Sequence, residues 1–233
     1  MKKVAILQSN YIPWKGYFDL INSVDEFILY DDMQYTRRDW RNRNKIKTPQ
    51  GLKWLTIPVE VKGKYFQKIN ETRISNPNWA VQHWQTIKQF YAHAPYFKHY
   101  NEIFEAFYLT NQDVLLSEIN FKLIQIINDI LGIKTTLRWS SEFELIDGQT
   151  EKLIGLCQQT GADVYLSGPA AKAYFDESSA EQMNIKVEWM DYSGYNEYSQ
   201  MYPPFEHGVS ILDLIFNEGP NATHFMKSFE LCV

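Results

Sequence analysis

The residues best suited to chemistry are polar groups placed directly after two short apolar runs near the N-terminus. Gln8 and Asn10 follow the first run (4–7), and Asp31 follows the second (27–30). Side-chain amides donate and accept hydrogen bonds, so they suit the orientation of a substrate. A carboxylate at such a position suits the binding of a ribose, a sugar or Mg²⁺. We therefore predict that all three side chains take part in catalysis.

Cations gather in the next polar segment, 33–51, whose only acidic residue is Asp39. The arginine fork binds phosphate or carboxylate oxygens through two parallel hydrogen bonds. Tyr35 and Trp40 are interleaved with these cations, which favours a local anion site over the alternative, a solvated surface loop. The cations of the segment are Arg37, Arg38, Arg41, Arg43, Lys45 and Lys47.

Other catalytic arrangements find little support. The five histidines show no ligand spacing with one another or with a cysteine, which argues against a metal site. No G-x-S-x-G nucleophile elbow is present. Cys157 falls in an amphipathic pattern and is predicted to be a core residue, and its distance from Cys232 in sequence predicts no disulfide framework. Tyrosines at 192, 195, 198 and 202 either stack on sugar or base rings or pack against a sheet.

The elements that must position these groups follow an α/β pattern. The N-terminal segment predicts a strand, a loop, a helix that Pro13 opens, and a second strand. Ligands of open α/β sheets bind beyond the carboxyl ends of the strands, where Gln8 and Asp31 stand. Helix and strand alternate again over 150–190. We predict an α/β fold with a Rossmann-like, mostly parallel sheet.

Between these two α/β segments, residues 76–132 read as a continuous helical block, either an insertion or a layer that covers the sheet. Three helices are predicted there, each with an apolar face, and Gly132 ends the last one. Both parts fit one domain over residues 1–233. The smaller predicted elements are a hairpin around 49–51 with a strand at 52–59, a weak strand at 66–75, and helices beginning at Pro169 and near Ser210.

Composition narrows the class of protein. The net charge is −5 at pH 7 over 233 residues, so no global basic field indicates a nucleic-acid partner or an anionic membrane. No apolar run approaches 18 residues, and the apolar run after the first three residues is too short for a signal peptide. The chain is expected to be a cytoplasmic protein without a membrane span. Aromatic residues make up 15%, which suits an aromatic-lined cleft.

One short motif is weakly similar to a nucleotidyltransferase pattern. Residues 13–17 (PWKGY) match the spacing of His-x-Gly-His at a helix start, with Trp14 and Tyr17 at the histidine positions. That resemblance implies that the helix N-terminus and Gly16 hold phosphates. It also implies a late loop at Ser167-Gly168, followed by Lys172. Without the histidines, the phosphate contacts would come from Lys15, Lys172 or the basic segment.

A closer resemblance covers almost the whole chain. Blocks in the same order look like those of the WbqC-like family: QSNYIPWKGYF at 8–18, WRNRNKI at 40–46, WLTIPV at 54–59, DVYLSGP at 163–169, YSQ at 198–200, and PF at 204–205 leading to SILD at 210–213. Members of this bacterial family occur with genes for O-antigen and other surface-polysaccharide synthesis, and glycine (aminoacyl) transfer to an amino sugar has been suggested. The resemblance implies a transferase or ligase whose small-molecule substrate is an amino sugar or a nucleotide-sugar.

The two resemblances combine into one hypothesis. The enzyme would bind ATP with Mg²⁺, or a nucleotide-sugar, and pass an activated acyl or aminoacyl group to an amine. The predicted catalytic residues are Gln8, Asn10, Lys15, Arg43 and Asp31, with Asp32 as the alternative to Asp31. The residues predicted to bind the cofactor are Tyr11, Gly16, Tyr17, Arg37, Asn44, Lys45, Ser167, Gly168 and Lys172.

Two alternatives stay open: a nucleotidyltransferase-like enzyme acting on a small molecule, and a non-catalytic binding or scaffold protein of the same pathway. Geometry separates them from the combined hypothesis. Convergence of Gln8, Asn10, Gly16, Arg43 and Ser167 on one cleft would support a ligand site. Arg43 and Ser167 on opposite faces would exclude the combined scheme.

Overall fold

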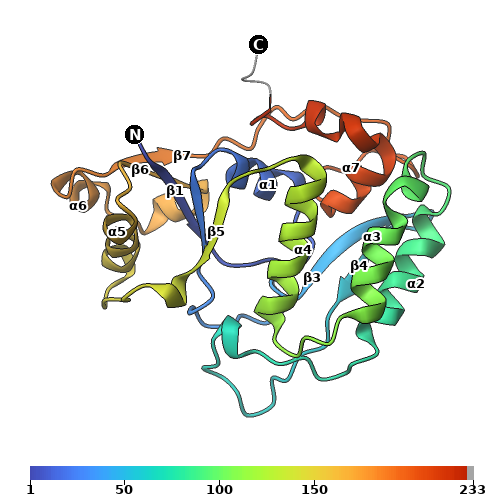
Figure 1. Cartoon of the computed structure of the whole chain (residues 1–233), viewed down its shortest axis with the longest axis horizontal. Helices are drawn as coiled ribbons and strands as arrows, with labels where there is room; N and C mark the ends of the chain where they lie inside the picture. Colours follow the sequence, from blue (N-terminus) through green and yellow to red (C-terminus); the bar gives the residue numbers. More distant parts are fainter. Residues whose placement is uncertain (230–233) are drawn as a thin grey trace.

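The computed structural model, which describes residues 1–229, contains a five-stranded parallel sheet in the order β5-β2-β1-β6-β7 (Figure 1). This arrangement confirms the predicted α/β class with a mostly parallel sheet. The strands are β1 (Lys3–Leu7), β2 (Glu26–Leu29), β5 (Thr136–Trp139), β6 (Val164–Ser167) and β7 (Lys186–Trp189).

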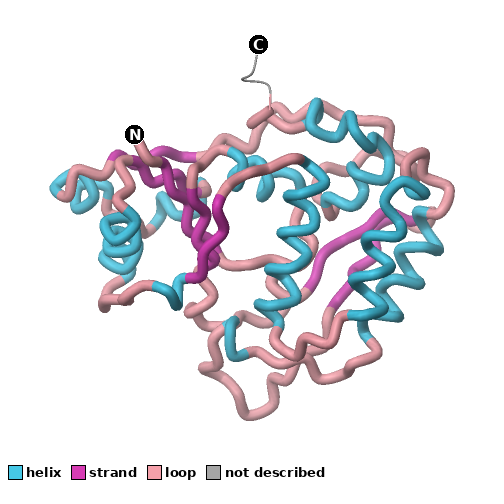
Figure 2. The backbone as a smooth tube through the Cα atoms, viewed as in Figure 1, coloured by secondary structure: helices cyan, strands magenta, loops and turns pink. Residues whose placement is uncertain are grey.

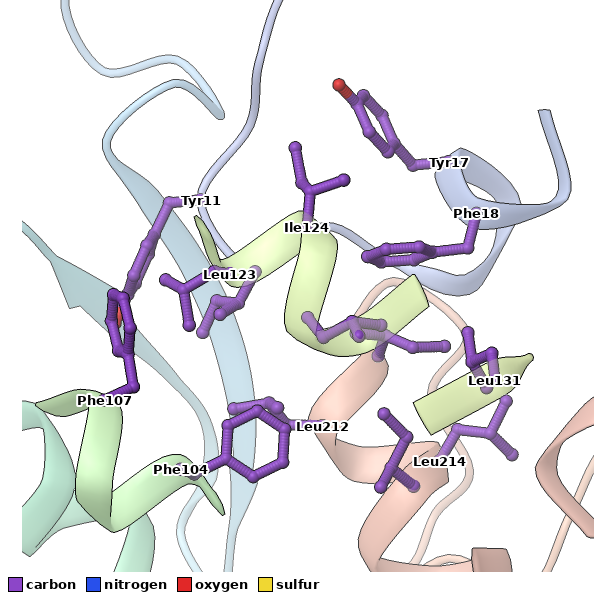
Figure 3. Packing of buried hydrophobic residues seen from close by; sticks show 14 of the residues in the cluster. Tyr11, Tyr17, Phe18, Phe104, Phe107, Leu123, Ile124, Leu131, Leu212 and Leu214 are labelled. Carbon is purple, nitrogen blue, oxygen red and sulfur yellow. The ribbon is translucent and has the colours of Figure 1, made fainter. Parts of the chain in front are cut away.

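Alternate positions along the strands face two separate apolar cores. Ala5, Phe27 and Leu29 join the larger core with helices α1 (Lys15–Asn22) and α4 (Leu116–Leu131). Val4, Ile6 and Ile28 join the smaller core with α5 (Gln149–Thr160), on the opposite face. Both faces of the sheet are therefore covered, as parallel sheets require. Figure 3 shows part of the larger core, where Phe18 of α1 lies among side chains of α4 and α7 (Ile211–Glu218).

The predicted helical block consists of α2 (Trp79–Tyr91), α3 (Phe97–Thr110) and α4. Gly132 ends α4 with a φ of 75°, a conformation that favours glycine. Strands β3 (Arg43–Thr48) and β4 (Gly51–Thr56) form the expected antiparallel hairpin, which lies apart from the five-stranded sheet (Figure 2). Tyr91 of α2 reaches this hairpin, because its hydroxyl accepts a hydrogen bond from Lys47 N at 3.0 Å.

Two of the smaller expectations were wrong, and a third was met by a different kind of helix. The strand after the hairpin turn ends at Thr56, three residues before its predicted end, since Pro58 has no N–H for a ladder. Instead of the strand expected over 66–75, residues 69–71 form η1 (Ile69–Glu71), where the Glu71 carboxylate accepts a bond from Lys68 N at 2.9 Å and closes a turn. Lys68, Arg73 and Ile74 take part only in isolated β-bridges. The segment that begins at Pro169 is the short 3₁₀ helix η3 (Pro169–Ala173).

The C-terminal part adds η2 (Ser140–Glu142), α6 (Glu177–Gln182), α7 and η4 (Gly219–Phe225). Helix α7 begins next to Ser210, as predicted, and Ser210 caps it, since its hydroxyl accepts a bond from Leu212 N at 3.3 Å. None of the helices within residues 1–229 has both the length and the apolar character that a bilayer span requires. Cys157 is buried and unpaired, and Cys232 lies outside the described residues.

Candidate functional site

A pocket of about 500 Å³ opens at the carboxyl ends of β1 and β6, where the sequence predicted the ligand site. The chain leaves β1 into Gln8, and β6 ends at Ser167 before Gly168. Both strand ends face the start of α5, because the helix before a parallel strand runs in the opposite direction. The polar residues that line this larger pocket are Gln8, Arg41, Gln149, Lys152 and Ser167, and its tyrosines are Tyr30, Tyr165 and Tyr174.

The larger pocket is electropositive. The Arg41 guanidinium and the Lys152 ammonium both line it, and Lys152 makes no ion pair within residues 1–229. The first turn of α5, at Gly148 and Gln149, adds backbone N–H groups and the positive end of a 12-residue helix dipole. Phosphate or carboxylate groups therefore suit this pocket.

A smaller pocket, of about 300 Å³, has a different character. Indole rings of Trp14 and Trp40 and the ring of Pro13 form its apolar walls. The side-chain amides of Asn10 and Asn44 supply its polar groups. Flat aromatic walls with a few amides suit a ring that has apolar faces and polar edges.

Arg41 lies between the two pockets. Its guanidinium donates to Gln8 Oε1 at 3.1 Å and also to Asn10 Oδ1. Gln8 lines the larger pocket, and Asn10 lines the smaller one. The Asp39 carboxylate, 3.7 Å away, supplies a partial countercharge. One cation thus holds both amides that follow β1.

Asp31 contacts the turn that carries Gln8 and Asn10, but its side chain is buried and lines neither pocket. One carboxylate oxygen accepts a bond from Ser9 N at 2.8 Å, and the other has no partner. Burial raises the pKa of Asp31 to about 6, while the Ser9 bonds and the Arg41 charge oppose the rise. Asp31 therefore positions the turn that carries Gln8 and Asn10.

Gly16 allows the ring of Trp14, a wall of the smaller pocket, to lie close to the start of α1. A Cβ at Gly16 would lie 2.3 Å from Cζ2 of the Trp14 ring, so only glycine lets this ring lie against α1. The other contacts of the Trp14 ring are edge-on, with Tyr192 at 5.3 Å and Tyr195 at 5.7 Å between ring centroids. The aromatic wall therefore depends on Gly16.

Comparisons with known proteins identify the family of the chain. The model of the WbqC-like protein family matches residues 8–225. The chain belongs to the WbqC-like family. It is also 52% identical to the uncharacterized protein Rv1507c of Mycobacterium tuberculosis (strain ATCC 25618 / H37Rv). The 227 aligned residues cover 97% of this chain and 98% of the relative. No solved structure matches the chain.

In this WbqC-like protein, five of the predicted residues line the two pockets. Gln8, Ser167 and Gly168 line the larger pocket, and Asn10 and Asn44 line the smaller one. Asn44 Nδ2 donates to Ile12 O at 2.9 Å, which fixes its amide in the pocket wall. The predicted cluster therefore spreads over two pockets instead of one cleft.

Three predicted residues are buried away from both pockets. The Tyr11 hydroxyl bonds to the His83 ring at 2.8 Å and to the Tyr108 hydroxyl at 2.7 Å, inside the larger core. The Tyr17 hydroxyl donates to the backbone oxygen of Gln8 at 3.0 Å. The Lys15 ammonium donates to Asn196 O at 3.1 Å, and burial lowers its pKa to about 8.

The other predicted cations also lie outside the pocket linings. The Arg43 guanidinium stacks 4.1 Å from the Trp54 ring centroid, and the Lys45 ammonium lies 5.2 Å from the same ring. Arg37 donates to Val61 O at 2.9 Å. The Lys172 ammonium lies 5.5 Å from the ring of Trp189. None of these four cations lines either pocket, so the roles predicted for them gain no support from the pocket geometry.

Sequence reasoning missed Arg41 and Lys152 as site residues. Arg41 belongs to the basic segment that was singled out, but its spacing alone does not distinguish it from Arg43. Lys152 could have been found from topology, because the start of a helix that precedes a parallel strand lies at the ligand edge.

The Asp31-Asp32 pair offers little room for Mg²⁺. Asp32 accepts bonds from Ser140 Oγ at 2.7 Å and from Asn70 Nδ2 at 3.2 Å, so both of its oxygens are used. Within residues 1–229, no group of three or more His, Cys, Asp or Glu side chains is arranged around a common metal position.

Proposed function

We propose that this protein is a group-transfer enzyme, a transferase or ligase, that joins an acyl or aminoacyl group to an amino sugar for surface-polysaccharide synthesis. The observation that carries the proposal is the position of Arg41, whose guanidinium contacts one amide in each of two pockets of unlike chemistry. Membership of the WbqC-like family supports the pathway.

The larger pocket suits the phosphate-bearing ligand, either ATP or a nucleotide-sugar. Its volume of about 500 Å³ fits the range of small-molecule sites. Lys152, Arg41 and the first turn of α5 meet the negative charge, and Tyr30 and Tyr174 offer rings on which a base or a sugar can stack.

The smaller pocket suits the sugar ring. The apolar faces of a pyranose pack on indole rings such as those of Trp14 and Trp40, and its hydroxyl and amine groups bond to amides such as that of Asn10. No charged side chain lines the smaller pocket, since its polar side chains are the neutral amides of Asn10 and Asn44. It therefore suits a neutral ring better than a phosphate.

The proposed reaction takes place beside Arg41. The neutral amine of the sugar attacks the activated acyl carbon, a C–N bond forms, and the bond to the phosphate leaving group breaks. The amine loses one proton to solvent. Arg41, held by Gln8 and Asn10, stabilises the negative charge that develops on the acyl oxygen and on the leaving phosphate.

A thermal-shift panel with ATP, CTP, UDP-sugars and dTDP-sugars tests this proposal. A ligand at about 100 times its dissociation constant adds roughly 2.7 kcal/mol of stability, which is readily seen. Arg41→Gln should weaken the binding of the responding ligand by about 10- to 150-fold, the value of a charge-assisted bond. Arg43→Gln is the matched control and should bind normally. No shift with any ligand, or equal losses in both variants, would contradict the proposal.

The two alternatives fit the geometry less well. A nucleotidyltransferase would bring phosphate against Gly16, but the ring of Trp14 lies there. A scaffold protein would be favoured by a basic segment remote from Gln8 and Asn10, whereas Arg41 contacts both. An ATP–pyrophosphate exchange assay with amino acids or sugar acids distinguishes two routes of acyl activation. Exchange indicates an acyl-adenylate formed by this protein, and its absence indicates transfer from a donor that is already activated.

A further inference from the structure

A loop of eight residues, 61–68, projects from the molecule between β4 and η1 (Figure 1, lower edge). It carries two adjacent aromatic side chains that pack on little else. Phe66 is 87% exposed and Tyr65 is 70% exposed. A largely exposed phenylalanine beside an exposed tyrosine lacks the free energy that burial would supply, so a contact surface is expected there.

The same loop is basic, although the whole chain is acidic. Lys62, Lys64 and Lys68 are exposed, and Arg37 and Arg38 lie on the neighbouring exposed segment, with the Arg37 guanidinium 5.9 Å from the Tyr65 ring centroid. Lys64 pairs with Glu60, and Lys68 pairs with Asp32 at 3.4 Å. The other three cations form no ion pair within residues 1–229.

Hydrogen bonds hold this loop in one shape. Gln34 Nε2 donates to Tyr65 O at 2.7 Å, and Arg37 donates to Val61 O at 2.9 Å. Gln67 Nε2 donates across the base of the loop to Glu60 O at 2.8 Å. The aromatic pair is therefore presented outward by an ordered backbone, and less conformational entropy is lost when it binds.

The loop also has a fixed relation to the larger pocket. Its C-terminal end returns to the residues that follow β2, where Ile69 N donates to Met33 O at 2.9 Å and Asn70 N donates to Asp31 O at 3.0 Å. Met33 lines the larger pocket. The loop and the pocket thus share the edge of the sheet at which the strands end.

We propose that loop 61–68 docks the protein on an anionic membrane surface. Phe66 and Tyr65 enter the boundary between headgroups and acyl chains, and the surrounding Lys and Arg side chains meet the negative headgroups. The local cations draw this face, rather than the acidic remainder, to the bilayer. Docking in this way holds the larger pocket near the membrane surface, independently of which reaction it catalyses.

Flotation with the full chain tests the proposal, in the absence of nucleotide. The protein should bind vesicles of equimolar phosphatidylcholine and phosphatidylglycerol, and it should not bind vesicles of phosphatidylcholine alone. Each cation near such a surface contributes about fivefold in affinity, so Lys62→Gln with Lys64→Gln should weaken binding about 25-fold. Phe66→Ala should weaken it about tenfold. Raising the salt to 1 M should release the protein, since the screening length falls to about 3 Å.

Matched controls keep the test specific to the loop. Lys98→Gln with Lys134→Gln removes two exposed cations elsewhere, and Leu109→Ala removes an exposed apolar side chain of α3; all should bind as the unchanged protein does. Arg41→Gln should also bind vesicles normally, which separates this proposal from the proposed function. Absence of binding to the anionic vesicles, or equal losses in loop and control variants, would overturn the proposal.

Discussion

Gly16→Ala tests whether the absence of a side chain at position 16 is what allows the Trp14 ring to pack against α1. The added methyl would lie 2.3 Å from Cζ2, 2.6 Å from Cη2 and 2.8 Å from Cε2 of that ring. Normal carbon contacts are about 3.5–4.0 Å, so the ring must move by about 1 Å or more. Because Trp14 forms a wall of the smaller pocket, we expect the pocket to change shape.

The size of the effect follows from two opposing contributions. Overpacking of this kind costs about 1–3 kcal/mol, whereas replacing glycine with alanine in a helix gains about 0.5–1 kcal/mol. We therefore expect Gly16→Ala to lower the free energy of unfolding by up to about 2.5 kcal/mol in urea denaturation. Gly155→Ala, within α5, is the control: its methyl would meet Ile146 at an ordinary 3.4 Å, so it should raise stability by about 0.5–1 kcal/mol.

A double-mutant cycle assigns the loss to the ring itself. In Trp14→Phe, the indole atoms that the methyl would meet are absent, so in that background Gly16→Ala should raise the free energy of unfolding by about 0.5–1 kcal/mol. In the unaltered background, Gly16→Ala should weaken glucosamine binding at the smaller pocket but leave the nucleotide shift intact. Loss of the nucleotide shift with normal stability would refute this reasoning and return Gly16 to a phosphate role.

Three further outcomes follow from other parts of the structure. Burial raises the pKa of Asp31 to about 6 from an ordinary 3.8, so the folded state keeps a proton that the unfolded chain loses. The free energy of unfolding should therefore fall by about 2 kcal/mol as pH rises from 4 to 6, and Asp31→Asn should remove that fall in urea titrations at each pH. Lys152→Gln should weaken nucleotide binding about tenfold by calorimetry without changing the melting temperature of the free protein. Asp213→Ala should lower the free energy of unfolding by about 3 kcal/mol in urea denaturation, because two buried hydroxyl groups lose their acceptor. These are the hydroxyls of Tyr91 and Tyr198, which donate to the Asp213 carboxylate at 2.7 and 2.6 Å. A decrease below about 1 kcal/mol would contradict this.

The scaffold was predictable because it depends on local pattern. The apolar runs at 4–7 and 27–30 became β1 and β2, and the helical block fell where its apolar faces indicated. Gln8 could be placed at the ligand edge for the same reason, since polar residues at strand ends follow from the topology of parallel sheets. Gly132 ended its helix as glycine commonly does.

The arrangement of the site was harder to predict because it depends on contacts between distant segments. Tyr11 follows the Gln-Ser-Asn triplet, yet its hydroxyl bonds to His83 and Tyr108, which come 72 and 97 residues later. Arg41 and Arg43 are two residues apart, yet they have different contacts. Arg41 bonds to the amides of Gln8 and Asn10, whereas Arg43 stacks on Trp54. Hydropathy and spacing carry no information on such choices.

The central claim is that Arg41 stands between a phosphate-bearing donor and an amino sugar, and mass spectrometry of the sugar product tests it most directly. The protein is incubated with ATP, a mixture of amino acids and a UDP-linked amino sugar. The account predicts a sugar whose mass has increased by one aminoacyl group, formed by the unchanged protein and by Arg43→Gln but lost in Arg41→Gln. An aminoacylated sugar formed equally well by Arg41→Gln, or none from protein that demonstrably binds both ligands, would contradict it.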